Sequence, residues 1–258
     1  MPVALITGAA RGIGAATAGS LAAGGWDLVL FDLCRDESAL GYRLASPEEL
    51  EATARRCGGE AIVGDVRSAD DLARAVERAV ERFGGLDAAV GAAGVLAAAG
   101  RAWEMPEEQW RTTLDINLSG IFNLARAAVP AMMARPAPRS GRFVAVSSAA
   151  ALKATARLAA YSASKAGIIG FVRGLAADLA DTGVTANAVL PGSTDTALLA
   201  HSAEIYGLDD PARLADHHVN HRIIRPEEVA AVAAWLCSEA SGALTGAAVP
   251  ADGGMTAR

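Results

Sequence analysis

Tyr161 and Lys165 stand four residues apart in the segment Tyr-Ser-Ala-Ser-Lys. On a helix this spacing places both side chains on one face. A phenol, with a pKa of about 10, is a poor base at neutral pH, but a neighbouring ammonium stabilises the phenolate and lowers that pKa. Ser148, at the end of a predicted strand, can hydrogen-bond a substrate oxygen and hold it against Tyr161. The three residues predict a proton relay between an alcohol and a carbonyl.

The same spacing also occurs on ordinary exposed helices, where a tyrosine and a lysine have no catalytic role. In this chain Lys165 is one of two lysines and Tyr161 is one of three tyrosines. This scarcity favours the catalytic interpretation over a chance placement.

A second group of residues, Thr7-Gly-Ala-Ala-Arg-Gly-Ile-Gly14, lies between the first predicted strand and the first predicted helix. Gly8 would allow a tight exit from the strand, Gly12 a close approach of the backbone to a pyrophosphate, and Gly14 close packing of helix on sheet. Arg11 and Ile13 complete the turn. The free N–H groups at the helix start would then face the phosphates. The alternative to a nucleotide-binding motif is an ordinary glycine-rich turn.

The following strands strengthen the nucleotide interpretation. Asp32 ends the second predicted strand, 18 residues after Gly14. A carboxylate there binds ribose hydroxyls and repels a 2′-phosphate, so NAD is favoured over NADP. Arg11 and Arg35 keep NADP open, because a nearby arginine can accept that phosphate. The sequence also offers Asp65 and Val66 for the adenine edge, and Ala93 and Gly94 for close passage of the cofactor.

The elements that would position these residues alternate between apolar strands and amphipathic helices. This alternation predicts one doubly wound Rossmann-type α/β domain over residues 1–258, with about seven parallel strands and helices on both faces. The predicted strands are Val3–Thr7, Asp27–Asp32, Glu60–Gly64, Leu86–Val90, Arg142–Ser147, Val184–Leu190 and Ala247–Pro250. The predicted helices are Gly12–Gly25, one that opens at Ser46-Pro-Glu-Glu49, Ala69–Phe83, Glu107–Ala134, Leu158–Ala180 and Pro226–Cys237.

Two long segments interrupt this alternation. Residues 33–46 separate the second strand from a helix start with a Ser46 cap, Pro47 and Glu49. Residues 193–225 hold all four histidines and are expected to form a substrate lid. His217 and His221 could share a helix face, but no acidic ligand completes a metal set, so no metal site is predicted and a polar lid surface or an interface is expected. Apolar residues expected to line the substrate pocket are Leu198, Leu199, Tyr206, Leu208 and Val219, with Trp103 and Met105 as further contributors.

Composition excludes several function classes. The 258 residues carry a net charge of −6, which argues against nucleic acid as a partner. No apolar run is long enough to span a membrane, and the N-terminus has no basic region typical of a signal peptide. The three cysteines are widely spaced and odd in number. A reducing cytoplasm is therefore the expected location.

Taken together, these motifs resemble the short-chain dehydrogenase/reductase family over the whole chain. The matching residues are Thr7-Gly8, Gly12, Gly14, Asp32, Asp65, Ala93-Gly94, Asn117, Ser147-Ser148, Tyr161, Lys165, Pro191-Gly192 and Asp252-Gly253-Gly254. The resemblance implies a catalytic tetrad of Asn117, Ser148, Tyr161 and Lys165. It implies that the Asn117 backbone and Lys165 hold a water, and that Asn117, Tyr161 and Lys165 also lie at the cofactor. It further implies that the family's usual homotetramer forms through the long helices and the C-terminal region. Its carboxamide-binding segment corresponds to Pro191, Gly192, Thr194 and Thr196. One departure is Ala92, where the family usually has Asn, which puts a local hydrogen bond in doubt.

A narrower resemblance links the chain to the subgroup of actinobacterial enzymes coupled to mycofactocin. It rests on the connection 33–46 and on the segments Gly41–Leu50, Gly141-Arg-Phe143, Pro191–Thr194 and Ile205–Leu208. The subgroup implies an NAD that stays bound and is reoxidised in place by the redox peptide. The connection could fold over the adenosine and slow its release, or it could be a surface loop without a role.

The sequence thus predicts an NAD-dependent oxidoreductase that interconverts a secondary alcohol and a ketone, with Tyr161 as acid/base. Two alternatives remain: a dehydrogenase with freely exchanging NAD(P), and a catalytically idle NAD-binding sensor.

Overall fold

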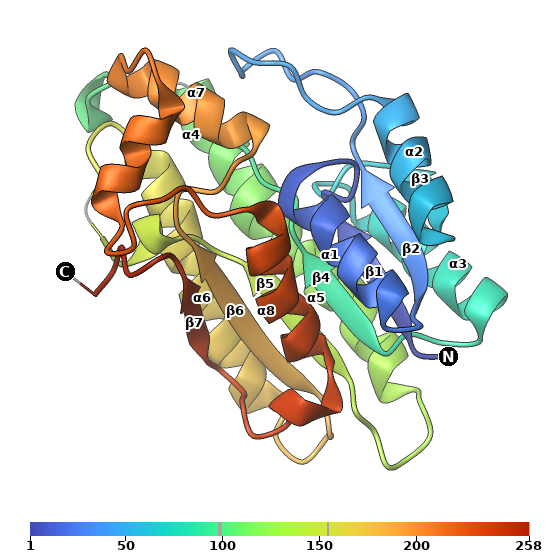
Figure 1. Cartoon of the computed structure of the whole chain (residues 1–258). Helices are drawn as coiled ribbons and strands as arrows, with labels where there is room; N and C mark the ends of the chain where they lie inside the picture. The colour runs from blue at the N-terminus through green and yellow to red at the C-terminus, as the bar shows by residue number, and fades with distance from the viewer. Residues whose placement is uncertain (98–99, 154, 258) are drawn as a thin grey trace.

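Short apolar runs form the strands at the centre of the molecule. The computed structural model describes residues 1–97, 100–153 and 155–257, and these contain one parallel sheet of seven strands in the order β3-β2-β1-β4-β5-β6-β7. The strands are β1 Val3–Thr7, β2 Asp27–Asp32, β3 Glu60–Val63, β4 Ala88–Gly91, β5 Arg142–Val146, β6 Thr185–Pro191 and β7 Ala248–Ala251. The strand order reverses between β1 and β4 (Figure 1), and ligands bind at such a switch point in open α/β sheets.

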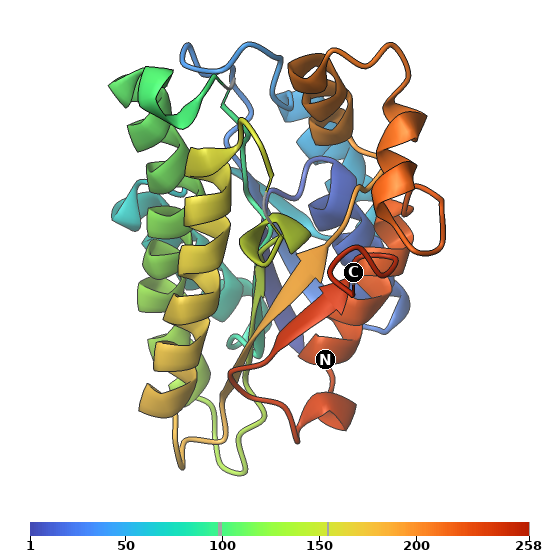
Figure 2. The same cartoon turned by 90° about the vertical axis from the view of Figure 1, so that its left-hand side faces the viewer.

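Helices cover both faces of the sheet (Figure 2). One face carries α1 Gly12–Ala23, α2 Pro47–Cys57 and α8 Pro226–Cys237, and the other carries α3 Ala69–Phe83, α4 Glu107–Leu114, α5 Gly120–Met133 and α6 Ala159–Asp178. Successive strand residues point to opposite faces. In β1, Ala4 and Ile6 therefore pack in one core, while Val3 and Leu5 pack in the other. The predicted doubly wound Rossmann-type fold is confirmed.

Most predicted elements appear close to their predicted limits, but the long helix predicted over 107–134 is not continuous. It consists of α4, a π-helical segment over Asp115–Ser119, and α5. The backbone stays helical throughout, so periodicity alone does not reveal the wide turn. This wide turn contains Asn117, one of the predicted catalytic residues.

The connection 33–46 crosses the carboxyl edge of the sheet and ends at α2. There Ser46 and Glu49 form the predicted capping box: the Ser46 hydroxyl accepts a bond from the Glu49 N–H, and the Glu49 carboxylate accepts one from the Ser46 N–H. In Figures 1 and 2 the connection lies beside α7 Ala197–Tyr206, an additional helix in the predicted lid. Two segments far apart in sequence therefore meet above the strand ends.

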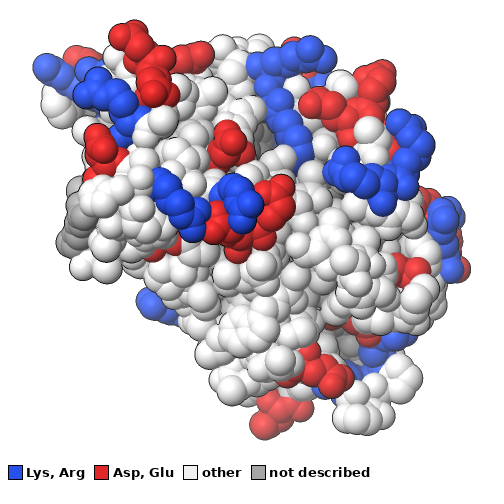
Figure 3. Space-filling view, in the orientation of Figure 1, with Lys and Arg blue, Asp and Glu red and all other residues white. Residues whose placement is uncertain are grey.

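In the described parts of the chain, no helix combines the length and the apolarity needed to cross a lipid bilayer. On the face in Figure 3, acidic and basic side chains are interspersed.

Candidate active site

Two adjoining cavities open at the carboxyl edge of the sheet. The first, with a volume of about 170 Å³, lies at the start of α1 and the ends of β1, β2 and β4. The predicted cofactor residues that line it are Gly8, Arg11, Gly12, Ile13, Gly14, Asp32, Asp65, Val66, Ala93, Gly94 and Thr196. Segments far apart in the sequence, from Gly8 to Leu198, thus converge at one place.

The glycine motif allows the backbone segments that follow β1 and β4 to lie close together. Gly8 has a φ of +67°, and a Cβ there would lie 2.6 Å from the Ala93 nitrogen, so a side chain cannot fit. Within the described chain, α1 begins without a side-chain cap and without an acidic residue in its first turn. Its first N–H groups are therefore free to meet an anion. A dinucleotide pyrophosphate fits this end of the cavity.

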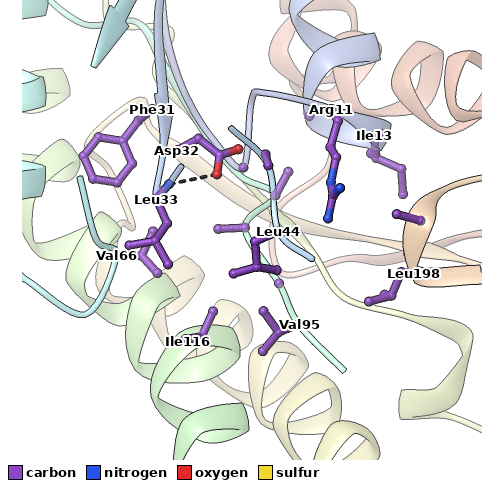
Figure 4. A pocket seen from close by; sticks show the side chains of 18 of the residues that line it. Arg11, Ile13, Phe31, Asp32, Leu33, Leu44, Val66, Val95, Ile116 and Leu198 are labelled. Carbon is purple, nitrogen blue, oxygen red and sulfur yellow. Dashed lines mark hydrogen bonds between the residues drawn. The ribbon is translucent and has the colours of Figure 1, made fainter. Parts of the chain in front are cut away.

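Asp32 faces the same cavity from the end of β2 (Figure 4). Its carboxylate accepts hydrogen bonds from the Ala10 N–H at 2.9 Å and the Leu33 N–H at 2.8 Å. Burial raises the pKa of this carboxyl group, and the backbone bonds and the Arg11 charge lower it in part. The carboxylate is fixed in orientation where ribose hydroxyls would be expected.

Asp65 and Val66 line the cavity after β3, as predicted for an adenine-binding edge. The Asp65 carboxylate is bound by Arg67 at 2.7 Å and by Arg35 at 3.2 Å. Burial raises the pKa of Asp65, but its contacts with Arg67 and Arg35 outweigh this effect and hold the pKa below its ordinary value. Arg35, one of the two arginines that kept NADP open, is thus paired with a carboxylate.

The connection 33–46 forms a wall of this cavity. The Arg11 guanidinium donates to the Arg43 carbonyl at 2.8 Å, which ties the connection to the glycine motif. Figure 4 places the Leu44 side chain between Asp32 and Leu198. Tyr42 lines the cavity as well, and its hydroxyl accepts a hydrogen bond from the Leu96 N–H at 3.0 Å. The connection contacts the loops after β1 and β4 rather than extending into solvent.

The second cavity, with a volume of about 440 Å³, lies between the loop after β5, the start of α6 and the lid. It shares Ile13, Ala92, Gly94, Thr196 and Leu198 with the first cavity. The predicted residues Ser148, Tyr161, Lys165, Pro191, Gly192, Thr194 and Thr196 all line it. The two cavities therefore join where a cofactor and a substrate would have to meet.

Tyr161 and Lys165 share one face of α6 as predicted, with the Lys165 Nζ 5.6 Å from the centre of the Tyr161 ring. The Lys165 Nζ donates to the Val146 carbonyl at 2.9 Å, and burial lowers the pKa of this lysine to about 8. Burial also raises the pKa of Tyr161, and a hydrogen bond with the Ser148 side chain lowers it in part. The net direction for Tyr161 therefore differs from the expected lowering, because desolvation disfavours the phenolate.

Asn117 lines neither cavity and is fully buried in the π-helical segment. Its side chain accepts from the Val95 N–H at 2.8 Å and donates to the Val95 carbonyl at 2.9 Å and the Ser164 hydroxyl at 3.1 Å. These bonds join the loop after β4 to α6, one residue before Lys165. The side chain of Asn117 thus positions the loop beside Gly94.

Ala92, the departure from the family pattern, lines both cavities. Thr7 supplies the hydrogen bonds at this point: its carbonyl accepts from the Ala92 N–H at 3.2 Å, and its hydroxyl accepts from the Ala93 N–H at 3.4 Å. The loop after β4 is therefore held without an asparagine at position 92.

The lid has its own small core, formed by Leu199, Ala203 and Leu214 with Tyr206, Leu208 and Ile223 around them. Of the predicted pocket residues, Leu198, Leu199 and Tyr206 line the second cavity. Leu208 packs inside the lid instead, and Val219 and Trp103 are exposed. Met105 is absent from the walls of both described cavities.

Among the described residues, no group of three or more His, Cys, Asp or Glu side chains is placed to hold a metal ion. The polar lid surface or interface expected for His217, His218 and His221 is wrong for His218, which is buried within the chain, and His201 is buried as well. His218 accepts from the Ser193 N–H at 3.0 Å through Nε2, and its Nδ1 lies 2.7 Å from the Arg222 carbonyl. His218 therefore joins the two ends of the lid, a role that spacing in the sequence does not signal.

Comparison with known proteins identifies the family that this chain resembles in sequence and structure. A family model described as enoyl-(acyl carrier protein) reductase matches residues 8–256. The (-)-trans-carveol dehydrogenase of Rhodococcus erythropolis is 37% identical, over 98% of this chain and 97% of that protein. The crystal structure of carveol dehydrogenase from Mycobacterium avium in complex with NAD superposes with a TM-score of 0.94 at 30% identity, over 100% of this chain and 98% of the other. A short chain dehydrogenase from Mycobacterium paratuberculosis bound to NAD gives a TM-score of 0.89 at 31% identity, with the same coverage.

The chain belongs to the short-chain dehydrogenase/reductase family. It is an oxidoreductase of that family, as the two joined cavities and the residues between them led us to expect.

Proposed function

We propose that this protein interconverts a secondary alcohol and a ketone, with NAD as the hydride carrier. One observation carries the proposal: Ser148, Tyr161 and Lys165 line a cavity that joins the first cavity, with its glycine motif and Asp32, at Gly94. The carveol dehydrogenases to which the chain is similar are named for the oxidation of a secondary alcohol.

In the proposed reaction Ser148 donates a hydrogen bond to the substrate oxygen and Tyr161 takes the hydroxyl proton during oxidation. NAD, when bound, supplies the acceptor for the hydride. Lys165 places a positive charge 5.6 Å from the centre of the Tyr161 ring, and a charge of this sign favours the phenolate. In the direction of reduction the same groups act in reverse, and Tyr161 gives its proton to the carbonyl oxygen.

NAD is proposed over NADP because the fixed Asp32 carboxylate would repel a 2′-phosphate. Both arginines that could offset this effect are engaged elsewhere, Arg11 with the Arg43 carbonyl and Arg35 with Asp65. The two solved relatives that contain NAD agree with this choice.

The proposed roles are tested with Tyr161→Phe, which removes the phenol and keeps the ring. We expect kcat for alcohol oxidation to fall by about a thousandfold or more, while the Kd for NAD, measured by calorimetry, stays within about threefold of the wild type. Full activity in this variant would overturn the mechanism. An intact protein that binds NAD but turns over no alcohol or ketone in a broad panel would favour the idle sensor.

We further propose that NAD stays bound between turnovers and is reoxidised in place, with mycofactocin as the acceptor that the subgroup resemblance suggests. The wall formed by Tyr42 and Leu44 and the Arg11–Arg43 bond support slow release of the adenosine half. The test is to dialyse the purified protein exhaustively, denature it, and identify the released nucleotide by mass spectrometry. Near-stoichiometric NAD is expected. Empty protein would favour free exchange, and NADP would contradict the role of Asp32.

A homotetramer formed through the long helices is also proposed. Phe122 on α5 is 50% exposed and packs edge-on against Phe171 of α6, with ring centres 6.2 Å apart. An exposed aromatic pair on long helices suits a subunit contact. Light scattering behind size-exclusion chromatography should give four chains for the wild type and a smaller species for Phe122→Glu.

A further inference from the structure

Among the described residues, the ionisable side chains that line the second cavity are basic or phenolic, although the protein is acidic overall. The chain has a net charge of −6, yet no Asp or Glu is found among the described residues that line this cavity. Its ionisable residues are Lys153, Lys165, His217, Tyr161 and Tyr206. Both lysines of the chain thus line one cavity. The mechanism uses Lys165 and leaves Lys153 without a role.

Lys153 follows the short 3-10 turn Ala149–Ala151 that begins next to Ser148. It is half-buried, and its Nζ donates to the Met255 carbonyl at 3.1 Å. An ammonium has three donors, and this is the one hydrogen bond of the Lys153 side chain within the described residues. None of the ion pairs between described residues involves Lys153. Within the described residues, the Lys153 ammonium therefore keeps unused donors and has no carboxylate partner.

The two lysines are placed for different tasks. Lys165 is nine-tenths buried or more, and its Nζ is directed at the Val146 carbonyl beside Gly94 and Tyr161. Lys153 instead reaches the C-terminal segment at Met255, which also lines the cavity. A neutral substrate would cover the Lys153 charge without balancing it, which costs free energy.

We infer that Lys153 binds a carboxylate on the substrate, so that the enzyme acts on secondary alcohols or ketones that also carry an anionic group. This inference deepens the proposed function and rests on it for the alcohol. A carboxylate would accept charge-assisted hydrogen bonds from the ammonium. No arginine is found among the described residues around this cavity, so a single carboxylate suits the site better than a phosphate, which arginine clusters typically bind.

The test compares two ligands that cannot react and differ in charge, cyclohexanecarboxylate and cyclohexanecarboxamide. Their Kd values for the NAD-loaded protein are measured by calorimetry in the wild type and in three variants. Lys153→Arg keeps the charge. Lys153→Gln removes the charge but can still donate to the Met255 carbonyl, so it separates ligand binding from a purely structural tie. Lys153→Met removes both functions.

In the wild type we expect the carboxylate to bind about tenfold more tightly than the amide. This preference should disappear in Lys153→Gln and Lys153→Met and persist in Lys153→Arg. Equal binding of the two ligands in the wild type, including failure of both to bind, overturns the inference. An unchanged preference in Lys153→Gln would also overturn it.

Failure of this inference and failure of the proposed function are distinguishable, because the binding test needs no turnover. If the carboxylate preference depends on Lys153 but Tyr161→Phe retains full activity, the anion site stands and the proposed mechanism falls. If neutral secondary alcohols are oxidised equally well by the wild type and Lys153→Gln, and the carboxylate preference is absent, the mechanism stands and the anion site falls.

Discussion

The ring of Tyr42 packs on the ring of His201, with their centres 4.4 Å apart. Tyr42 belongs to the connection 33–46, and His201 belongs to α7 of the lid. The Tyr42 hydroxyl also accepts from the Leu96 N–H at 3.0 Å, and the His201 Nδ1 lies 3.1 Å from a Glu204 carboxylate oxygen. The Tyr42–His201 contact thus joins the wall of the first cavity to the lid beside the second cavity.

A first prediction concerns this contact. Tyr42→Ala removes the ring from His201 and the acceptor from the Leu96 N–H, so both the connection and the lid become easier to open. We expect NAD to dissociate about tenfold faster or more. Tyr42→Phe keeps the ring and should have the smaller effect. The measurement is the loss of bound NAD with time under excess of an NAD-consuming enzyme.

Val80→Ala serves as the control for this prediction, because Val80 is 44% exposed on α3 and lines neither cavity. Dissociation of NAD at the wild-type rate from Tyr42→Ala would show that the contact does not retain the cofactor.

A second prediction follows from the pKa of Lys165, which burial lowers from 10.5 to about 8. Between these values the unfolded chain holds a proton on this lysine that the folded protein has lost, so the free energy of unfolding rises with pH. The cost of burying the charge is fully present below pH 8 and is gone above pH 10.5. Relative to Lys165→Met, nucleotide-free wild type should therefore gain up to about 3 kcal/mol across this window. Urea unfolding at several pH values measures the difference, and parallel pH curves for the two proteins would refute the prediction.

A third prediction concerns the choice of nucleotide. Asp32→Asn removes the charge that would repel a 2′-phosphate but keeps an oxygen that can accept from the Ala10 N–H. The ratio of kcat/KM for NADP to that for NAD should rise by about tenfold or more. Asp27→Asn, at the other end of the same strand, is the matched control. If the ratio does not move in Asp32→Asn, this carboxylate does not discriminate between the two nucleotides.

A fourth prediction addresses the base of the lid. His218→Ala leaves the Ser193 N–H and the Arg222 carbonyl without their partner and opens a cavity beside Gly192. Loss of a fully buried, doubly bonded side chain should lower the free energy of unfolding by about 2–4 kcal/mol. His217→Ala, at the neighbouring exposed residue, should change it by less than about 0.5 kcal/mol. Similar urea midpoints for the two variants would contradict this role of His218.

The sequence was sufficient to predict the sheet and most of the residues that the structure brings together at its carboxyl edge. Local patterns predict these parts. Buried strands appear in the sequence as apolar runs. The glycine motif, Asp32 and Ser148 each lie at or just after the carboxyl end of a strand, and these ends share one edge of the sheet. The spacing of Tyr161 and Lys165 fixes their common face on any helix. The positions of these residues can therefore be predicted with little information about distant contacts.

The remaining features depend on contacts between distant segments. Nothing near Tyr42 in the sequence indicates that its ring meets His201, and nothing near His218 indicates that it joins Ser193 to Arg222. The direction of the Tyr161 pKa is a similar case. Helical spacing predicts the nearby lysine, but the burial that raises the pKa of Tyr161 is a property of the assembled fold.

The π-helical segment between α4 and α5 makes this part of the chain sensitive to length rather than to composition. A wide turn holds one more residue than an α-helical turn of the same span. Deleting a residue from Asp115–Ser119 would let one regular helix of the same span run through, so α4 and α5 would keep their relative orientation while the wide turn is lost. Asn117 would then lose the local backbone that directs its side chain to Val95. We therefore expect evolution to exchange residue types within this segment more readily than to alter its length.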